Sequence, residues 1–355
     1  MSGRGVWLGR AGRARAPRGE QRLHGHGTRL AVIAALVVVL GLLIILSVSF
    51  GASRLPFRDV IAALFGAGDA QTSMLIHKLR LPRVLVAVLV GLALGTAGAM
   101  MQGVFRNPLA SPDIMGVNGG ASVAAVAFLT LTGSRFSIYW LPVAAIAGAF
   151  IAALLIYLLG WKRGAAPFRL VLIGVGIATA MSALTTFLLI SGPAFKATQV
   201  LNWLSGTIYG LSTPHLLALM PWVAVFLPIG WMMSRHLNVL ALGDATAAGL
   251  GSSVQRNRLV LLLISVALAG GAVGIAGGIG FVGLMAPHMA RMLVGIRHGM
   301  LIPVSALVGA ILLVGSDMAG RLLFMPYDLP AGIFTAAIGA PFFFYLLYTN
   351  RQLGN

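Results

Sequence analysis

The chain contains a series of apolar stretches, each about as long as a helix that crosses a lipid bilayer. A transmembrane helix needs roughly 20 apolar residues to span about 30 Å of hydrocarbon. The first stretch, Leu30–Phe50, contains no charged residue. We predict an all-α polytopic membrane protein with about ten transmembrane helices, the others at about 84–105, 116–133, 138–160, 168–191, 214–234, 258–279, 280–296, 301–320 and 331–349. The apolar run from Arg258 to Arg291 is too long for one helix, so we expect it to break at Gly277–Gly280.

The composition excludes the other broad classes of protein. Hydrophobic residues make up 59% of the 355 residues and charged residues only 9%, against about a quarter charged in a soluble domain. A soluble fold of this size could not bury that much apolar surface. The chain has no cysteine, which excludes a disulfide-stabilised scaffold.

Glycines recur at helical spacing within the predicted spans. Gly91, Gly95 and Gly98 share one span, and Gly270, Gly274 and Gly278 share another. Small residues four positions apart allow helix backbones to approach closely in lipid. The pattern predicts a tightly packed bundle and names no function.

The net charge of +18 indicates orientation in the membrane rather than nucleic-acid binding. With the N-terminus inside and ten crossings, the C-terminus is also inside, and 17 of the 25 basic residues lie on the cytoplasmic side. This bias agrees with the positive-inside rule. We therefore expect membrane lipid, and no nucleic acid, around this chain.

Residues 1–29 form a separate segment that precedes the membrane domain predicted at 30–350. They contain seven arginines, one glutamate and no apolar run. We expect a disordered cytoplasmic tail. A cleaved signal peptide fits less well because the polar region is long. An organelle transit peptide, or a start codon placed too far upstream, would also account for the segment.

The sequence lacks the motifs of an enzyme or a metal site. No Gly-Lys-Ser/Thr loop, HExxH pair or GxSxG turn occurs in a suitable context, so we expect no catalytic residue, bound metal or cofactor. Ionisable residues within the spans are few. Asp317 lies near the outer end of its span, where we expect it to be hydrated or paired with Arg321, and we interpret His288 as a structural histidine.

Two loops carry charge patterns that suggest partners. The inside loop 235–257 contains a predicted short helix that starts near Asp244 and exposes Leu242, Ala245 and Leu250. It is too small to form a core, so it fits a groove on a partner or lies flat on the membrane face. Outside, basic residues gather before the second span, either as a docking surface for an acidic partner or as charge that an external segment tolerates: Arg54, Arg58, Lys78, Arg80 and Arg83.

Ordered motifs along nearly the whole chain from residue 30 resemble the FecCD-type permeases, the membrane subunits of bacterial ABC importers for ferric siderophores, haem and cobalamin. The matching segments are Leu81-Pro82-Arg83, Gln102, Arg106–Pro112, Gly116-Val117-Asn118, Leu242–Gly251, Gly280–Leu284, Pro287–Arg291, Leu329–Gly332 and Gly339-Ala340-Pro341. The Arg-rich tail is the departure from the family pattern.

The resemblance implies a multi-pass subunit of the bacterial cytoplasmic membrane in a type II ABC importer bundle. It implies a second permease subunit (a homodimer or a paralogous heterodimer), a dimer of cytoplasmic ATPases that use the ATP, and an extracytoplasmic siderophore-binding protein. It assigns docking of the binding protein to Arg80, Arg83 and Arg321. The segment near 240–253 aligns with the coupling segment that contacts the ATPase, through Gly243, Asp244, Ala245, Ala248, Gly249, Leu250 and Gly251.

The resemblance is less specific about the cargo. Asn202–Gly210 and Ser111–Gly116 are similar to the iron-chelate members, most of all those for ferric citrate and ferric catecholates. We therefore expect import of a ferric siderophore and assign Gln102, Asn118, Asn202 and Trp203 to the translocation pathway. Two different functions compete with this one: an ion-coupled secondary carrier or channel that acts without an ATPase, and a structural membrane protein that transports nothing.

Overall fold

The computed structural model describes residues 26–51, 55–64, 66–132, 136–161, 167–194 and 197–350. Most of the predicted tail lies outside these residues, and its last four residues begin the first helix. Within this part of the chain each of the ten predicted spans is matched by a helix: α1 (His26–Ser49), α4 (Leu81–Phe105), α5 (Val117–Leu131), α6 (Leu141–Gly160), α7 (Pro167–Ser191), α9 (Thr213–Met232), α12 (Val254–Ala276), α13 (Val282–Val294), α14 (His298–Leu323) and α15 (Ala331–Asn350).

Not all of these helices are equally long. Seven segments among the described residues are long and apolar enough to cross a membrane, and those in α5, α13 and α15 are apolar but shorter. Shorter elements connect them: α2 (Phe57–Leu64), α3 (Ala70–Met74), the π-helical turn η1 (Leu75–Arg80), the 3₁₀ turns η2 (Pro112–Met115) and η3 (Ile138–Trp140), α8 (Ala197–Leu204), α10 (Ser234–Leu240) and α11 (Asp244–Gly249).

The helix that contains the second span is extended at its N-terminal end by α3 and η1, so helical structure continues from Ala70 to Phe105. Within η1 the amide of Leu81 donates to the carbonyl of Ile76, five residues earlier. The next residue, Pro82, has no amide proton to donate, which explains why the regular α-helical pattern is interrupted here. The π turn ends at Arg80, so it sets the direction in which this side chain leaves the helix.

The predicted break between α12 and α13 is confirmed. Gly277 ends α12 with a φ of 74°, in the left-handed region that glycine adopts without strain. A side chain at this position would overlap the carbonyl of Trp203. The tight packing of this connection against α8 therefore requires glycine.

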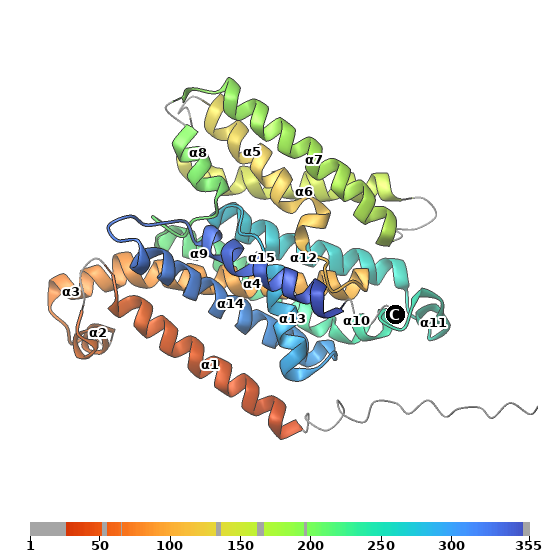
Figure 1. The fold of residues 1–355 in the computed structure, drawn as a ribbon, viewed down its shortest axis with the longest axis horizontal. Helices are drawn as coiled ribbons and strands as arrows, with labels where there is room; N and C mark the ends of the chain where they lie inside the picture. The colour runs from red at the N-terminus through yellow and green to blue at the C-terminus, as the bar shows by residue number, and fades with distance from the viewer. Residues whose placement is uncertain are drawn as a thin grey trace, which may run out of the picture.

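Helix α4 occupies the centre of the bundle, where it packs against α14, α12, α13 and α9. Helices α5, α6 and α7 gather on one side, and α1 runs along the opposite side next to α14 (Figure 1). The buried core follows this arrangement, because α4 and α12 are mostly enclosed while α1 and α7 expose most of their side chains. Exposed apolar side chains are the expected surface of a helix that faces lipid.

The glycines of α4 explain the close packing at this centre. A methyl group at Gly95 would overlap the carbonyl of Ser305 on α14, and one at Gly98 would overlap the backbone of Gly283 on α13. The predicted role of these residues in backbone contact is therefore confirmed for α4. Of the second set, Gly270 and Gly274 face α6, whereas Gly278 lies beyond the end of α12.

Candidate functional site

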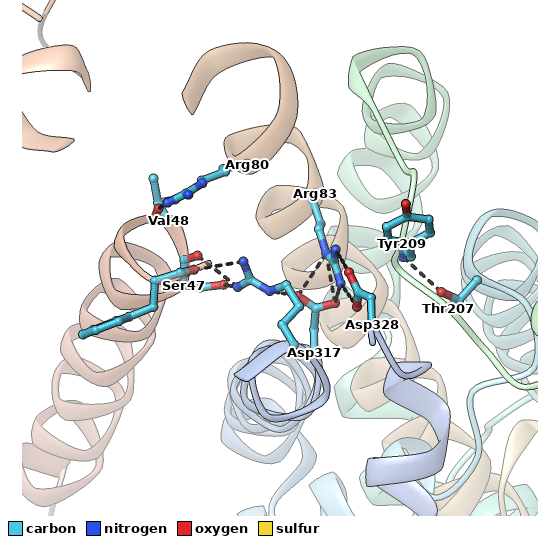
Figure 2. Close-up of polar contacts among 10 residues, drawn as sticks. Ser47, Val48, Arg80, Arg83, Thr207, Tyr209, Asp317 and Asp328 are labelled. Carbon is cyan, nitrogen blue, oxygen red and sulfur yellow. Dashed lines mark hydrogen bonds and ion pairs between the residues drawn. The ribbon is translucent and has the colours of Figure 1, made fainter. Parts of the chain in front are cut away.

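A charged cluster links three segments on the predicted outer side of the bundle, with Arg83 at its centre (Figure 2). Nη1 and Nη2 of Arg83 donate to the two carboxylate oxygens of Asp328 at 2.6 and 2.9 Å. On its other edge, Nε and Nη2 donate to Oδ1 of Asp317 at 3.1 and 2.7 Å. The guanidinium therefore binds two carboxylates at once, and it also lies 5.7 Å from the ring centroid of Tyr209.

The other two predicted docking arginines bind the C-terminal end of α1. Nη1 of Arg80 donates to the carbonyls of Val48 and Ser49 at 2.7 and 3.1 Å. Arg321 donates to the carbonyls of Ser47 and Phe50 at 2.9 and 3.1 Å. The last carbonyls of a helix lack partners within the helix and carry its partial negative charge, so two cations here hold α1 against the bundle.

These contacts leave little of the three arginines for a partner. The side chains of Arg83 and Arg321 are 12% and 10% exposed, and Arg80 is buried. Arg58 and Lys78, by contrast, are exposed on α2 and η1. Arg54 lies outside the described residues. The role of Arg80, Arg83 and Arg321 in docking remains a prediction, and the structure adds an internal role for each of them.

A cavity of about 390 Å³ lies between the start of α5 and the α12–α13 connection. Asn118 lines it, and its Oδ1 is buried without a hydrogen-bond partner in the described part of the chain. Asp113 lines the same cavity and accepts a hydrogen bond from the hydroxyl of Ser111. Asp113 is exposed, so nearby protein atoms that displace water raise the pKa of its carboxyl only against solvent, and the hydrogen bond from Ser111 opposes the shift.

Gln102 lines a second cavity, of about 680 Å³, among the predicted cytoplasmic loops. Its side chain is buried; Nε2 donates to the carbonyl of Leu284 at 3.2 Å, and Oε1 has no partner among the described residues. Asn202 and Trp203 lie on α8 and line neither of these two cavities, Asn202 being exposed and Trp203 packed in the core. The four predicted pathway residues therefore do not form one site in a single chain.

The predicted short helix of the inside loop is present as α11. Asp244 lies in its first turn, as predicted, directly after Gly243 at the N-cap position. The carboxylate accepts two hydrogen bonds of 2.9 Å from Nη2 of Arg258 and lies 3.2 Å from Nη2 of Arg106. Of the other predicted coupling residues, Gly243 is half-buried. The remaining five are exposed: Ala245, Ala248, Gly249, Leu250 and Gly251.

Sequence reasoning found one partner of Asp317, Arg321, but missed Arg83 as the partner shared by Asp317 and Asp328. Asp317 was expected to be hydrated or paired with Arg321; that ion pair exists at 3.6 Å, but Arg83 is closer and makes the hydrogen bonds. Asp328 was not singled out at all. The available signal was charge balance, since the few acidic residues of so basic a chain need partners wherever they are buried. His288 packs edge-on against Phe342 with ring centroids 5.6 Å apart.

Comparison with known proteins gives a consistent result over almost the whole chain. The sequence model of the FecCD transport family matches residues 37–349. A probable siderophore transport system permease protein, YfhA of Bacillus subtilis (strain 168), is 47% identical over 324 residues, which cover 89% of this chain and 94% of that protein. The Fe(3+) dicitrate transport system permease protein FecD of Escherichia coli (strain K12) is 39% identical over 323 residues, covering 91% of this chain and all of that protein.

A solved structure supports the same assignment. It is described as an inward-facing conformation of a metal-chelate type ABC transporter, and it superposes with a TM-score of 0.83 at 31% identity. The match covers 90% of this chain and 99% of that chain. The chain belongs to the FecCD transport family.

Proposed function

We propose that this protein is the membrane-spanning permease subunit of an ATP-driven ABC importer that carries a ferric siderophore across the bacterial cytoplasmic membrane. The observation that carries the proposal is the family match over residues 37–349, together with relatives named as siderophore and ferric citrate permeases. The ferric enterobactin permease FepG of Escherichia coli (strain K12), 37% identical over 302 residues, adds support for a ferric chelate as cargo. The chain supplies the pathway, and ATP is hydrolysed on separate partner subunits.

The partners follow from the same assignment. A second permease subunit, identical or paralogous, completes the pathway, and a dimer of ABC ATPases binds the cytoplasmic face. The exposed small residues of α11 and the exposed Leu250, 65% accessible, support this face as the ATPase contact. Both chain termini lie in the cytoplasm.

The outer face receives a siderophore-binding protein. Arg80 and Arg321 both bind the end of α1, and Arg321 shares Asp317 with Arg83, so the three arginines gather in one region that faces the proposed binding protein. Charge pairing with acidic side chains of that partner guides orientation and association rate more than it supplies affinity. Because each arginine is already bonded within the chain, docking requires that it share or exchange a partner.

The cargo pathway runs past the cavity lined by Asn118 and Asp113. Amide and carboxylate groups with free hydrogen-bonding capacity suit a chelate rich in hydroxyl, carboxylate and amide groups. Gln102, on the same helix as the cavity-lining Leu94, supplies a further polar group toward the cytoplasm.

Deletion of the gene, followed by growth on a panel of ferric chelates as sole iron sources, tests the proposal. We expect growth to fail on one chelate class and to return when the intact chain is restored. Uptake of radioactive iron in that chelate should disappear when the partner ATPase carries an inactivating substitution. Uptake that survives loss of the ATPase and instead follows an ion gradient would establish the secondary carrier, and unchanged growth on every chelate would contradict a role in iron import.

A further inference from the structure

Helix α11 is held to the rest of the protein by few apolar contacts. Of its six residues only Ala247 is buried, and the flanking Leu242 and Leu250 are 59% and 65% exposed. Cavities of about 680 and 600 Å³ lie on its two flanks, next to Leu242 and Leu250 respectively. Packing alone therefore does not fix the position of this helix.

Within the part of the chain that the structure describes, the side-chain contacts that tie α11 to other helices are the charged contacts of Asp244. Its carboxylate binds Arg258, whose side chain is 2% exposed, and it also pairs with Arg106, whose side chain is 38% exposed. A buried guanidinium is stable only when it is paired, so the contact with Arg258 is strongly required. The ion pair between Asp244 and the more exposed Arg106 is weaker because solvent screens it.

The two arginines come from the two most enclosed helices of the bundle. Arg258 lies in the second turn of α12, and Arg106 ends α4. Both helices line the 390 Å³ cavity, α4 through Leu94 and α12 through Ala269 and Val273. One carboxylate on α11 therefore bridges the cytoplasmic ends of two cavity-lining helices.

The backbone conformation of Arg106 indicates that its side chain is needed at this position. Arg106 adopts the left-handed conformation, with φ 51° and ψ 36°, which is strained for a residue other than glycine. Glycine would end the helix here without that strain. On the facing segment Gly243 has a φ of 99°, and a side chain added to it would meet Nη1 of Arg106 at 3.4 Å. Strain is retained where the side chain is needed.

We propose that Asp244, Arg106 and Arg258 form the linkage that transmits movement of α11 to α4 and α12, and that Asp244 acts within the permease rather than as a contact for the ATPase. The proposal rests on the proposed function and deepens it. When the ATPase displaces α11, the ion pairs pull on the ends of both helices, because α11 has few other attachments. The three residues are positioning residues: they control the shape of the pathway by acting on α4 and α12.

The test uses the complete importer, with both permease subunits, ATPase and binding protein, reconstituted in lipid vesicles. Arg106→Gly removes the side chain while favouring the observed backbone conformation, and Asp244→Asn keeps the shape while removing the charge. For both we expect the ATPase to co-purify as with the unchanged chain. We expect the chelate transported per ATP hydrolysed to fall about tenfold, a size typical of coupling between two sites.

Two controls separate linkage from assembly and from simple structural damage. Leu250→Glu, on the exposed side of α11, should reduce co-purification of the ATPase. Arg106→Lys keeps a cation within reach of Asp244 and should retain most of the transport per ATP. A normal ratio in Arg106→Gly, a ratio in Arg106→Lys as low as in Arg106→Gly, or loss of the ATPase from Asp244→Asn would each overturn the proposal. Failure of the unchanged chain to bind an ATPase would instead contradict the proposed function.

Discussion

Arg83 brings together α4, α14 and the segment before α15 through two carboxylates that flank one guanidinium. Removing three charges from water is costly, and the cost is recovered only when the geometry is good and the hydrogen bonds are complete. Here the fork of Arg83 makes paired contacts on two edges, so the geometry meets that condition. The cluster gives these three segments a defined arrangement relative to one another.

The two acidic partners of Arg83 should differ in their contribution to stability. Asp317→Asn removes the charge from a side chain that is 3% exposed and leaves both Arg83 and Arg321 short of a partner; we expect the free energy of unfolding to fall by about 3 kcal/mol. Asp328→Asn changes a side chain that is 23% exposed, and we expect a loss of about 1 kcal/mol. Thermal unfolding of the purified variants in one detergent measures both. A larger loss for Asp328→Asn would show that the cluster is organised around the other carboxylate.

Patterns among residues close in the sequence identified the charged residues but not all of their partners. The spacing of four between Asp317 and Arg321 predicted a contact that the structure contains, yet the stronger partner, Arg83, is 234 residues away in the chain. Asp244 shows the same limit: it lies in the first turn of α11, as predicted, but that position did not indicate that its side chain would bind Arg106 and Arg258. Such pairs depend on which helices become neighbours, which a single sequence does not encode in any local pattern.

At the scale of helices, the thickness of the bilayer makes sequence prediction effective. Each predicted span overlaps an observed helix because roughly 20 apolar residues are needed to cross, whatever the helix packs against. The break at Gly277 was also predictable, since clustered glycines rarely continue a helix. What the sequence could not specify is which glycine faces which helix, because that depends on the rotation of each helix within the bundle.

The glycine contacts of α4 give a direct test of this packing. Gly95→Ala places a methyl group against the carbonyl of Ser305, so we expect a clear loss of thermal stability and of monodisperse protein. Gly176→Ala on α7 adds the same methyl group where nothing lies within 4 Å. This control should be neutral or slightly stabilising, by at most about 1 kcal/mol, because alanine favours the helix more than glycine does. Equal behaviour of the two variants would contradict the close approach of α4 and α14.

At the scale of the whole molecule, orientation follows from the distribution of charge and from the number of crossings. Between Lys78 and Arg256 lie five of the helices that match predicted spans: α4, α5, α6, α7 and α9. If all five cross, the two residues lie on opposite sides of the membrane. The shortest of the five is α5, whose 15 residues span only about 22 Å at 1.5 Å per residue, less than the thickness of the hydrocarbon layer. An odd number of crossings therefore depends on this short helix being completed by its flanking turns.

Single-cysteine labelling tests orientation and crossing number together, because the natural chain has no cysteine and any thiol introduced is unique. Lys78 and Arg256 are both exposed, so Lys78→Cys and Arg256→Cys offer accessible thiols. In spheroplasts we expect a membrane-impermeant maleimide to label Lys78→Cys at once and Arg256→Cys only after permeabilisation. The reverse result would invert the topology. Labelling of both without permeabilisation would mean an even number of crossings between them, and α5 would then be the helix that enters the membrane without crossing it.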